Sequence, residues 1–312
     1  MSARMYCIGL ILFDSFTIKI RRPCAGICFV LLRVNETTYT RPSTDKNLSD
    51  PFHGGESTGN DRIRHLITSS NMTTYKDTRN GTLGLNFSTK LSAWLALGCI
   101  TARQVHEYLL AFEDGKTDLG KGVHGYGKGE NKGTAAVRFE LLWRDYFRLT
   151  TRKFGPRLFR IGGFKNDTST TWKYPQKDGE TQKKVTRFLE GTTGTGFIDA
   201  SMRELFLTGY TSNRLRQNVA SFLAKHLGID WRIGAEWYES LLCDYDLSSN
   251  WGNWQYNAGV GNDPREARVF NPVKQVWHNF PTKGMCILIL SRHTTTTHKE
   301  STSRTGSKNC GP

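Results

Sequence analysis

The pattern of apolar and polar positions divides the chain into three zones. Residues 1–50 alternate short β-prone runs with stretches rich in Thr, Ser and Asn, and they show no sustained helical period. Over residues 51–275, apolar side chains recur at the three- and four-residue spacing of amphipathic helices. Residues 276–312 become rich in Thr, Ser, Lys and His. The pattern therefore predicts a helical domain between an irregular N-terminal flank and a disordered or poorly packed tail.

Four runs in the middle zone carry helix signals. Residues 88–97 predict a short helix that opens on Ser and Thr, and Thr101 predicts the start of the next one. Gly228 stands where a helix C-terminus favours glycine. Strand signals are scarce and no strand–helix–strand alternation occurs, so an all-α fold is expected. The apolar positions at helical spacing are Val105, Leu109 and Phe112 in the second run, Val137, Leu141, Leu142, Tyr146 and Leu149 in the third, and Val219, Phe222, Leu223 and Leu227 in the fourth.

A glycine-rich stretch at residues 113–133 contains two chance matches to nucleotide-binding motifs. Gly120, Gly122 and Gly125 have the spacing of a dinucleotide fingerprint, but no strand precedes them and more glycines follow where a helix should begin. An overlapping run resembles a phosphate-binding loop, but Gly129 stands where Ser or Thr should bind magnesium. A flexible linker is therefore expected.

Charge narrows the choice of partner. The 312 residues include 43 Lys and Arg against 28 Asp and Glu, a formal net charge of +15. That surplus favours a polyanion such as nucleic acid, or a negatively charged membrane surface, and salt-sensitive binding is its physical signature. The apolar runs at residues 8–13 and 27–32 are too short to span a bilayer, so no membrane protein is expected.

The seven cysteines show no paired spacing. A disulfide framework would need such pairing, and Cys24 with Cys28 lacks the second ligand pair of a metal site. We therefore expect no metal and an intracellular location, with nucleus, cytoplasm and mitochondrion left open.

A hydroxyl-rich turn is the first candidate for ligand binding. It places Ser88, Thr89, Lys90 and Ser92 at an expected helix start, where free backbone N–H groups and the helix dipole favour phosphate. Hydroxyls and a lysine so close together suit a pyrophosphate. From the spacing alone, a plain helix cap followed by a surface turn is the favoured alternative.

Two further segments combine charged and aromatic residues. Glu140, Trp143 and Arg144 fall on one side of a helix, which suits either a site or a buried ion pair beside an aromatic ring. Residues 244–256 bring acids, amides and indoles together, and such polar groups are costly to bury without partners. A polar heterocycle such as a flavin would supply donors and acceptors for them.

Taken together, these segments resemble the FAD-binding domain of the photolyase/cryptochrome family, and within it the cryptochrome DASH branch. The resemblance runs collinearly over residues 51–275, from a Pro-Phe-His-Gly-Gly-Glu motif to an Asn-Pro-Val-Lys-Gln motif. It implies the all-α FAD-binding helical domain of that family. The flanks do not resemble the family, and its usual N-terminal α/β domain is absent from the sequence. We therefore interpret the chain as truncated and do not expect an antenna pigment of the folate type.

The resemblance implies FAD as cofactor and assigns residues around it. Asp244 is expected to pair with Arg216, Asp246 to hydrogen-bond the cofactor, and Asn250 to face the flavin N5 region. The other cofactor contacts that it implies are Tyr75, Ser88, Thr89, Lys90, Leu91, Ser92, Arg144 and Asn213.

The resemblance also implies residues for the reaction. Glu140 and Trp143 match the pair that meets an extruded pyrimidine dimer. Trp254 and Trp231 match two steps of a chain that carries electrons to the flavin, and Trp172 is the candidate for the outer step. A plain core role is compatible with all three tryptophans of this chain.

The substrate follows from two departures from classical photolyases. Tyr256 stands where they carry tryptophan and Gln217 where they carry methionine, as in the DASH branch. Because the smaller ring should grip an extruded dimer less well, single-stranded DNA is favoured over duplex, and RNA is kept as an alternative. The candidate phosphate contacts, which are equally compatible with solvated surface charges, are Arg79, Arg214 and Arg268.

The implied function is FAD-dependent, blue-light-driven repair of cyclobutane pyrimidine dimers by a monomeric enzyme of the deoxyribodipyrimidine photo-lyase type. Two alternatives stay open: a flavin photoreceptor without repair, and an inactive truncated fragment.

Overall fold

The computed structural model of the chain describes residues 52–82, 84–263, 265 and 268–279. All of them belong to one compact unit, Arg41–Pro312. The predictions for the flank at 1–50 and for nearly all of the tail lie outside the described residues.

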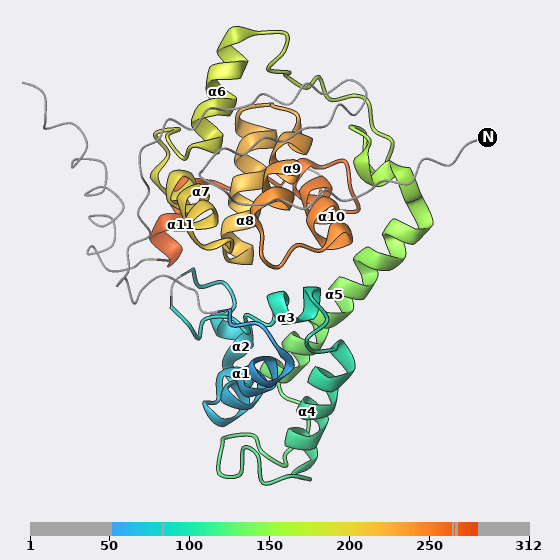
Figure 1. The fold of residues 1–312 in the computed structure, drawn as a ribbon, viewed down its shortest axis with the longest axis vertical. Helices are drawn as coiled ribbons and strands as arrows, with labels where there is room; N and C mark the ends of the chain where they lie inside the picture. The colour runs from blue at the N-terminus through green and yellow to red at the C-terminus, as the bar shows by residue number, and fades with distance from the viewer. Residues whose placement is uncertain (1–51, 83, 264, 266–267, 280–312) are drawn as a thin grey trace, which may run out of the picture. The chain divides into compact units, whose positions relative to one another are not determined.

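The described residues form helices joined by loops, and the expected all-α fold is confirmed (Figure 1). Among them, one isolated bridge between Lys173 and Ile229 is the only strand-like pairing. None of these helices has the length and apolar character needed to cross a membrane. In chain order they are α1 (Glu56–Thr68), α2 (Asn71–Thr78), α3 (Ser92–Ala96), α4 (Ala102–Asp114), α5 (Lys132–Phe154), the 3-10 helix η1 (Gly155–Phe159), α6 (Gly179–Leu189), α7 (Gly196–Thr208), α8 (Asn213–Ser221), the π-helical turn η2 (Phe222–His226), α9 (Trp231–Leu241), α10 (Leu247–Ala258) and α11 (Pro272–Asn279).

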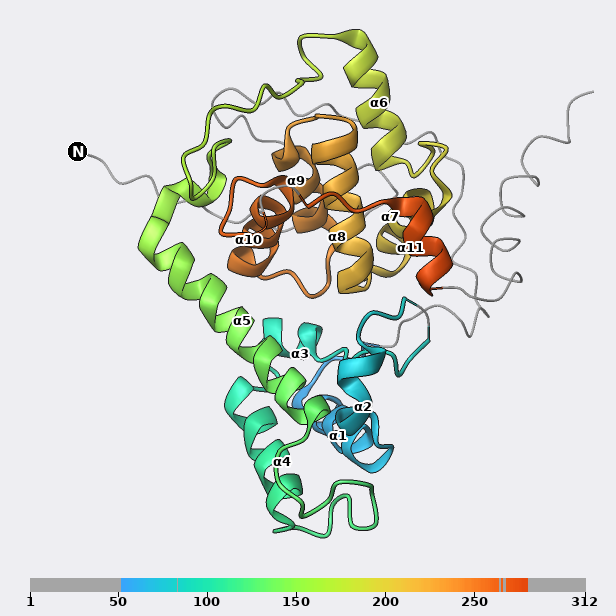
Figure 2. The same ribbon diagram turned by 180° about the vertical axis from the view of Figure 1, so that it is seen from behind.

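Two apolar cores hold these helices together. The first lies among α1, α2, α4 and the start of α5, and the second among α7, α8, α9 and α10 (Figure 1 and Figure 2). Full burial of one large apolar side chain contributes about 1.5–3 kcal/mol, so both cores stabilise their helices strongly. Fully buried side chains include Ile63, Leu66, Ile67, Leu109 and Phe112 in the first core, and Leu158, Phe188, Ile198, Trp231 and Tyr238 in the second.

The long helix α5 contributes to both cores. Near its start it crosses α2 so closely that a side chain at Gly133 would collide with the backbone carbonyls of Met72 and Thr73. Farther along, Phe147 packs on Gly252 of α10, where a side chain would collide with its ring. These two glycines permit the close approaches that join α5 to each core.

The helix expected over residues 88–97 is shorter than predicted. α3 covers only the second half of that stretch, so the prediction that Ser88 and Thr89 open a helix is wrong. Lys90 has a left-handed φ of 52°, which a right-handed helix cannot include. In addition, the Arg62 guanidinium donates to the carbonyl oxygens of Ser88 and Thr89, so these carbonyls bond to a side chain of α1 and not to helical N–H groups.

The third predicted helix is α5, but the helix does not bury its whole apolar stripe. Val137 is buried, whereas Leu142, Tyr146 and Leu149 are exposed, the last to 65%. α5 turns one side toward α2 and another toward α10, so no single stripe faces the protein along its whole length. Apolar spacing predicts a helix without predicting which neighbours a long helix will meet.

Three local predictions are confirmed. Thr101 caps α4 in a reciprocal capping box with Gln104. Gly228 adopts a φ of 66° just after the helical run that ends with η2. The segment between α4 and α5 is a loop in which Gly120 and Gly122 also have positive φ, as a turn-rich linker requires.

Candidate functional site

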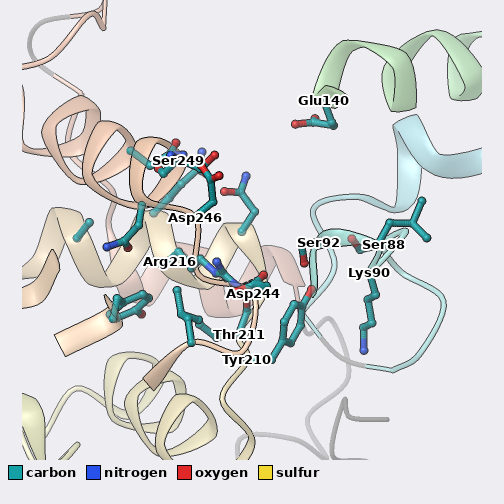
Figure 3. Close-up of a pocket in the computed structure, with 18 of the residues that line it drawn as sticks. Ser88, Lys90, Ser92, Glu140, Tyr210, Thr211, Arg216, Asp244, Asp246 and Ser249 are labelled. Atoms are coloured by element: carbon teal, nitrogen blue, oxygen red, sulfur yellow. Dashed lines mark hydrogen bonds and ion pairs between the residues drawn. The ribbon is translucent and has the colours of Figure 1, made fainter. Parts of the chain in front are cut away.

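A cavity opens between the second core and the turn at residues 88–92 (Figure 3). It has a volume of about 210 Å³ and is open to solvent. Figure 3 shows Ser88, Lys90 and Ser92 on one side of it and Asp244 on the other. The predicted site residues that line it are Tyr75, Ser88, Thr89, Lys90, Leu91, Ser92, Glu140, Asn213, Arg216, Gln217, Asp244, Asp246, Asn250 and Trp254.

An ion pair between Arg216 of α8 and Asp244 stabilises the cavity wall. Nη2 of Arg216 donates to both carboxylate oxygens of Asp244, at 3.0 and 2.8 Å, and Nε donates to the carbonyl of Thr211 at 2.8 Å. Burial by itself would lower the pKa of Arg216, but the charge and hydrogen bonding of Asp244 raise it above its ordinary value. The expected pairing of Arg216 with Asp244 is therefore present, and it favours the charged form of the Arg216 guanidinium.

α10 supplies a polar edge of the cavity. Asp246 caps this helix by accepting from the Ser249 N–H at 2.8 Å, and it also binds Arg148 at 3.2 Å. Burial would raise the pKa of Asp246, but the hydrogen bonds from Ser249 and Arg148 lower it below its usual value. The Asn250 amide donates to the carbonyl of Ala235 in α9 at 2.9 Å, which directs its amide oxygen to other partners. Asp246 and Asn250 can thus both accept hydrogen bonds from a ligand.

Several buried polar atoms on the cavity wall have no hydrogen-bond partner among the described residues. They are Thr211 Oγ1, Tyr238 OH and Asn257 Oδ1. Buried polar groups are nearly always bonded in folded proteins, so three such atoms in one cavity indicate a ligand with matching donors and acceptors. The polar ring edge and ribityl hydroxyls of FAD provide such groups. The residues of the cavity therefore fit this cofactor.

The turn at residues 88–92 keeps the groups predicted for phosphate although it is not a helix start. Ser88, Thr89 and Ser92 line the cavity. Lys90 is buried, with its amine 4.9 Å from the Phe87 ring centroid and close to a second ring. Hydroxyl and amine groups, and not a helix dipole, would therefore hold a phosphate here.

Glu140 of α5 lies at the edge of the cavity and forms an ion pair with Arg79 at 2.5 Å. Burial raises the pKa of Glu140, and the positive charges of Arg79 and Lys76 oppose that rise. A carboxyl group whose pKa is raised can keep its proton and donate it in a hydrogen bond.

Trp143 does not line the cavity but belongs to a group of rings outside it. Its ring centroid lies 5.2 Å from that of Tyr146 and 6.2 Å from that of Tyr256. Arg268 lies over the Tyr256 ring at 5.5 Å, and Arg265 donates to the Tyr256 hydroxyl at 2.8 Å. We call Trp143, Tyr146 and Tyr256 the outer platform.

The three arginines predicted to contact phosphate lie near one another. Burial lowers the pKa of Arg214 first, and the positive charges of Arg79 and Arg268 lower it further. Such a group of like charges attracts a polyanion. Arg214 also donates to Gln217 at 3.1 Å, so this predicted DNA contact is linked to a residue of the cavity wall.

Arg144, which was expected at the flavin, does not line the cavity. Its Nη2 donates to the carbonyl of Leu95 at 3.3 Å, and its Nη1 lies 3.7 Å from Asp145. The side of α5 that carries Arg144 thus bonds to α3 in this structure.

The three tryptophans of the expected electron chain are buried. Trp254 lines the cavity and packs against Gly234 of α9, where any side chain would collide with the indole. Trp231 begins α9 and donates its indole N–H to the carbonyl of Ile161 at 3.1 Å. Trp172 belongs to the same core, without a ring contact to Trp231 among the described residues.

The cavity also contains residues that the sequence does not single out. Asn253 and Asn257 follow Asn250 at helical spacing on α10, so their shared face is a signal that the sequence does carry. Thr211 and Tyr238 come from separate segments, and no local pattern marks them.

Comparison with known proteins identifies the class. Residues 137–285 match the model of the FAD binding domain of DNA photolyase. The domain at these residues is therefore similar to the FAD binding domain of DNA photolyase, which supports FAD as its cofactor. The sequence is also similar to proteins named cryptochrome DASH, as its motifs predict.

Cryptochrome DASH of Xenopus laevis is 49% identical, over 75% of this chain and 41% of that protein. A Neurospora crassa protein, whose provisional name is cryptochrome DASH, mitochondrial, is 58% identical over 73% of this chain and 33% of its own length. The crystal structure of Synechocystis sp. PCC6803 cryptochrome matches with a TM-score of 0.66 at 43% identity, over 76% of this chain and 45% of that one. The chain thus spans less than half the length of each.

Proposed function

We propose that this domain uses FAD and blue light to split cyclobutane pyrimidine dimers, preferably in single-stranded DNA. The main observation behind this proposal is that Glu140 lies between the cavity and the outer platform. Glu140 lines the cavity with the unpartnered polar atoms, and Trp143 of the outer platform follows it by one turn of α5. A base stacked on the platform would therefore lie next to a flavin in the cavity.

Reduced FAD, when bound and excited by light, supplies the electron that starts the splitting of the dimer. The residues of the chain bind and orient. Asp246 and Asn250 would accept hydrogen bonds from the cofactor, and the Arg216–Asp244 pair would hold the wall against it. Glu140, when protonated, would donate a hydrogen bond to a carbonyl of the dimer.

The outer platform supports the choice of single-stranded DNA. A dimer must leave the base stack to reach the cavity, which costs a few kcal/mol in a duplex and less in a single strand. Tyr256 offers a smaller stacking surface than an indole, and Arg265 holds its hydroxyl. Arg79, Arg214 and Arg268 would contact the phosphates. Because phosphate contacts do not distinguish ribose from deoxyribose, RNA would compete with DNA for this surface.

The direct test uses the purified full chain. Its flavin absorbance is measured first, and then the loss of dimers from single-stranded and duplex oligonucleotides under blue light and in the dark. We expect about one flavin per chain and light-dependent repair that is faster in the single strand. Absence of flavin, or bound flavin without dimer loss on either substrate, would contradict the proposal.

Glu140→Gln separates the carboxyl group from the rest of the site. As the pH rises through the raised pKa of Glu140, the carboxyl ionises and can no longer donate a hydrogen bond, so repair by the wild type should fall. Glutamine remains a donor at every pH, so the weaker repair by the variant should not fall over the same range. Parallel pH profiles would contradict the role of Glu140.

A flavin photoreceptor without repair is the second candidate. The buried Trp254 and Trp231 favour it, because a relay that reduces the flavin serves signalling as well as repair. Flavin photoreduction in a protein that leaves dimers intact would single out this function. Because the Neurospora relative is named as mitochondrial, mitochondria are the compartment in which a tagged chain should be sought first.

A further inference from the structure

Arg62 of α1 is a buried cation that bonds to the cavity wall without lining the cavity. It is 9% exposed, and among the described residues no carboxylate pairs with it. All three of its nitrogens donate instead to neutral oxygens of one short segment. Nε donates to the carbonyl of Thr89 at 3.0 Å, Nη1 to Asn86 Oδ1 at 3.2 Å, and Nη2 to the carbonyls of Leu85 and Ser88 at 2.9 and 3.1 Å. One side chain thus holds the whole segment that leads into the turn at residues 88–92.

The charge of Arg62 is only partly compensated. Burial lowers its pKa to about 10, against an opposing effect of Tyr210, so the guanidinium remains charged at neutral pH. The oxygens that bind it carry no net charge, whereas buried charges normally pair with an opposite charge. Lys90 places a second buried cation in the same turn. A negatively charged group of a ligand beside this turn would therefore be stabilised by both cations.

The hydrogen bonds of Arg62 also decide which groups of the turn are left for a ligand. The carbonyl oxygens of Ser88 and Thr89 bind Arg62, whereas the hydroxyls of both residues form no hydrogen bond within the part of the chain that the structure describes. Both residues line the cavity, and Figure 3 shows Ser88 on the same side of it as Lys90. A turn whose acceptors are occupied and whose hydroxyl donors are available suits the oxygens of a phosphate, which only accept.

We propose that Arg62 is a positioning residue for the phosphates of the cofactor, which holds the turn so that the hydroxyls of Ser88 and Thr89 can donate to them. The inference rests on the proposed function, because FAD has to occupy the cavity. Arg62 acts through the turn, since its own atoms do not line the cavity. The planar fork of a guanidinium donates to several carbonyls in fixed directions, which a lysine amine on its flexible stem does not reproduce.

A general stabilising role of Arg62 is the competing explanation. In that case, loss of its hydrogen bonds loosens the cavity wall, and every flavin binds more weakly to the same extent. If Arg62 positions the turn for phosphate, flavins that carry phosphate bind more weakly and riboflavin does not. Riboflavin and FMN are the matched pair of probes, because they differ by one phosphate group.

The test titrates the full chain, freed of its cofactor, with FAD, FMN and riboflavin, and it follows flavin fluorescence. Arg62→Lys keeps the positive charge but loses the fork. Its affinity for FAD should fall by about tenfold or more, its affinity for FMN should also fall, and its affinity for riboflavin should change by less than about twofold. Arg64→Lys is the control, because Arg64 lies on the same helix in an exposed pair with Asp61 and should match the wild type for all three flavins.

Asn86→Ala is a milder form of the same change. Asn86 is exposed, and its side-chain oxygen accepts from one nitrogen of Arg62, so the substitution removes one bond and leaves the guanidinium in place. Its affinity for FAD should fall by about threefold, with riboflavin unchanged. If Arg62→Lys does not fold, as urea unfolding would show, this variant decides the question, and wild-type affinity for FAD would then contradict the inference.

The outcomes separate this inference from the proposed function. A wild-type chain that binds no flavin contradicts both. Equal losses for FAD, FMN and riboflavin in Arg62→Lys overturn the inference and leave the proposed function in place. So does a loss confined to FAD, because it would connect Arg62 with the adenosine end of the cofactor and not with the phosphates.

Discussion

The cofactor cavity and the outer platform use the same helices, α5 and α10, for opposite purposes. In the cavity, polar groups are buried, some are fixed by ion pairs, and Thr211, Tyr238 and Asn257 keep atoms that find no partner within the described part of the chain. On the outer platform, half-buried and exposed rings touch edge to edge and Arg268 lies over the Tyr256 ring. A cavity for a resident cofactor can leave polar atoms for the ligand to satisfy, whereas a surface for a transient polymer has to stay accessible to water. Substitutions in the two regions should therefore differ in which quantity they change.

The largest effect is expected from Arg216→Gln in the cavity. It leaves Asp244, whose side chain is 2% exposed, as a buried carboxylate without its cation, and breaking such a pair typically costs about 3–5 kcal/mol. Urea unfolding of the cofactor-free protein measures this loss. As a control, Arg64→Gln breaks an exposed pair with Asp61 and should cost at most about 1 kcal/mol. Equal losses would erase the distinction between cavity and surface charges.

Trp143→Ala tests the outer platform. Stacking of a base on an aromatic side chain contributes about 1–3 kcal/mol, so the affinity for a single strand with a dimer should fall by about that much. Flavin content should not change, because Trp143 does not line the cavity. Fluorescence anisotropy with a labelled oligonucleotide measures the affinity, and Leu149→Ala, at an exposed site on the same helix, is the control. Loss of flavin from the Trp143 variant would show that the two regions are not separable.

Thr211→Val should have effects of opposite sign with and without cofactor. Removing a buried hydroxyl that lacks a partner should stabilise the cofactor-free protein by about 1 kcal/mol, and it should weaken flavin binding if the cofactor satisfies that hydroxyl. Urea unfolding and flavin titration measure the two quantities. Thr150→Val is the matched control, since its buried hydroxyl donates to the Phe147 carbonyl at 2.9 Å and its loss should destabilise. If the cofactor-free Thr211→Val variant is less stable than the wild type, the Thr211 hydroxyl already has a hydrogen-bond partner without the ligand.

The smallest effect is expected from Arg268→Gln at the rim of the platform. One lost phosphate contact on a single strand should reduce the slope of log affinity against log salt by about 0.7. Anisotropy titrations at several salt concentrations give the slope, and flavin content should stay constant. An unchanged slope would limit Arg268 to its contacts within the protein, the rings of Tyr256 and Phe270 and the carboxylate of Asp263.

Local signals in the sequence predict most of the helices but not their partners. The capping box at Thr101 and the left-handed Gly228 act within a few residues, so they can be read directly. The helix start at Ser88 fails because Arg62, 26 residues earlier, takes the carbonyls of that turn. The exposed Leu142 and Leu149 are missed for a related reason: α5 is shared between two cores, and its apolar spacing does not record which side each core covers.

The sequence by itself determined the helical class, the resemblance to a family and most of the residue types that line the cavity, because motif identity and helical spacing survive without coordinates. Only the tertiary structure decided which of those residues share the cavity: Gln217 lines it, whereas Trp143 and Arg144 do not. It also brought Thr211 and Tyr238 to the wall and bonded Arg62 to the turn at residues 88–92. The physical reason is that helix formation depends on neighbours along the chain, while a cavity depends on which faces distant helices bury against one another.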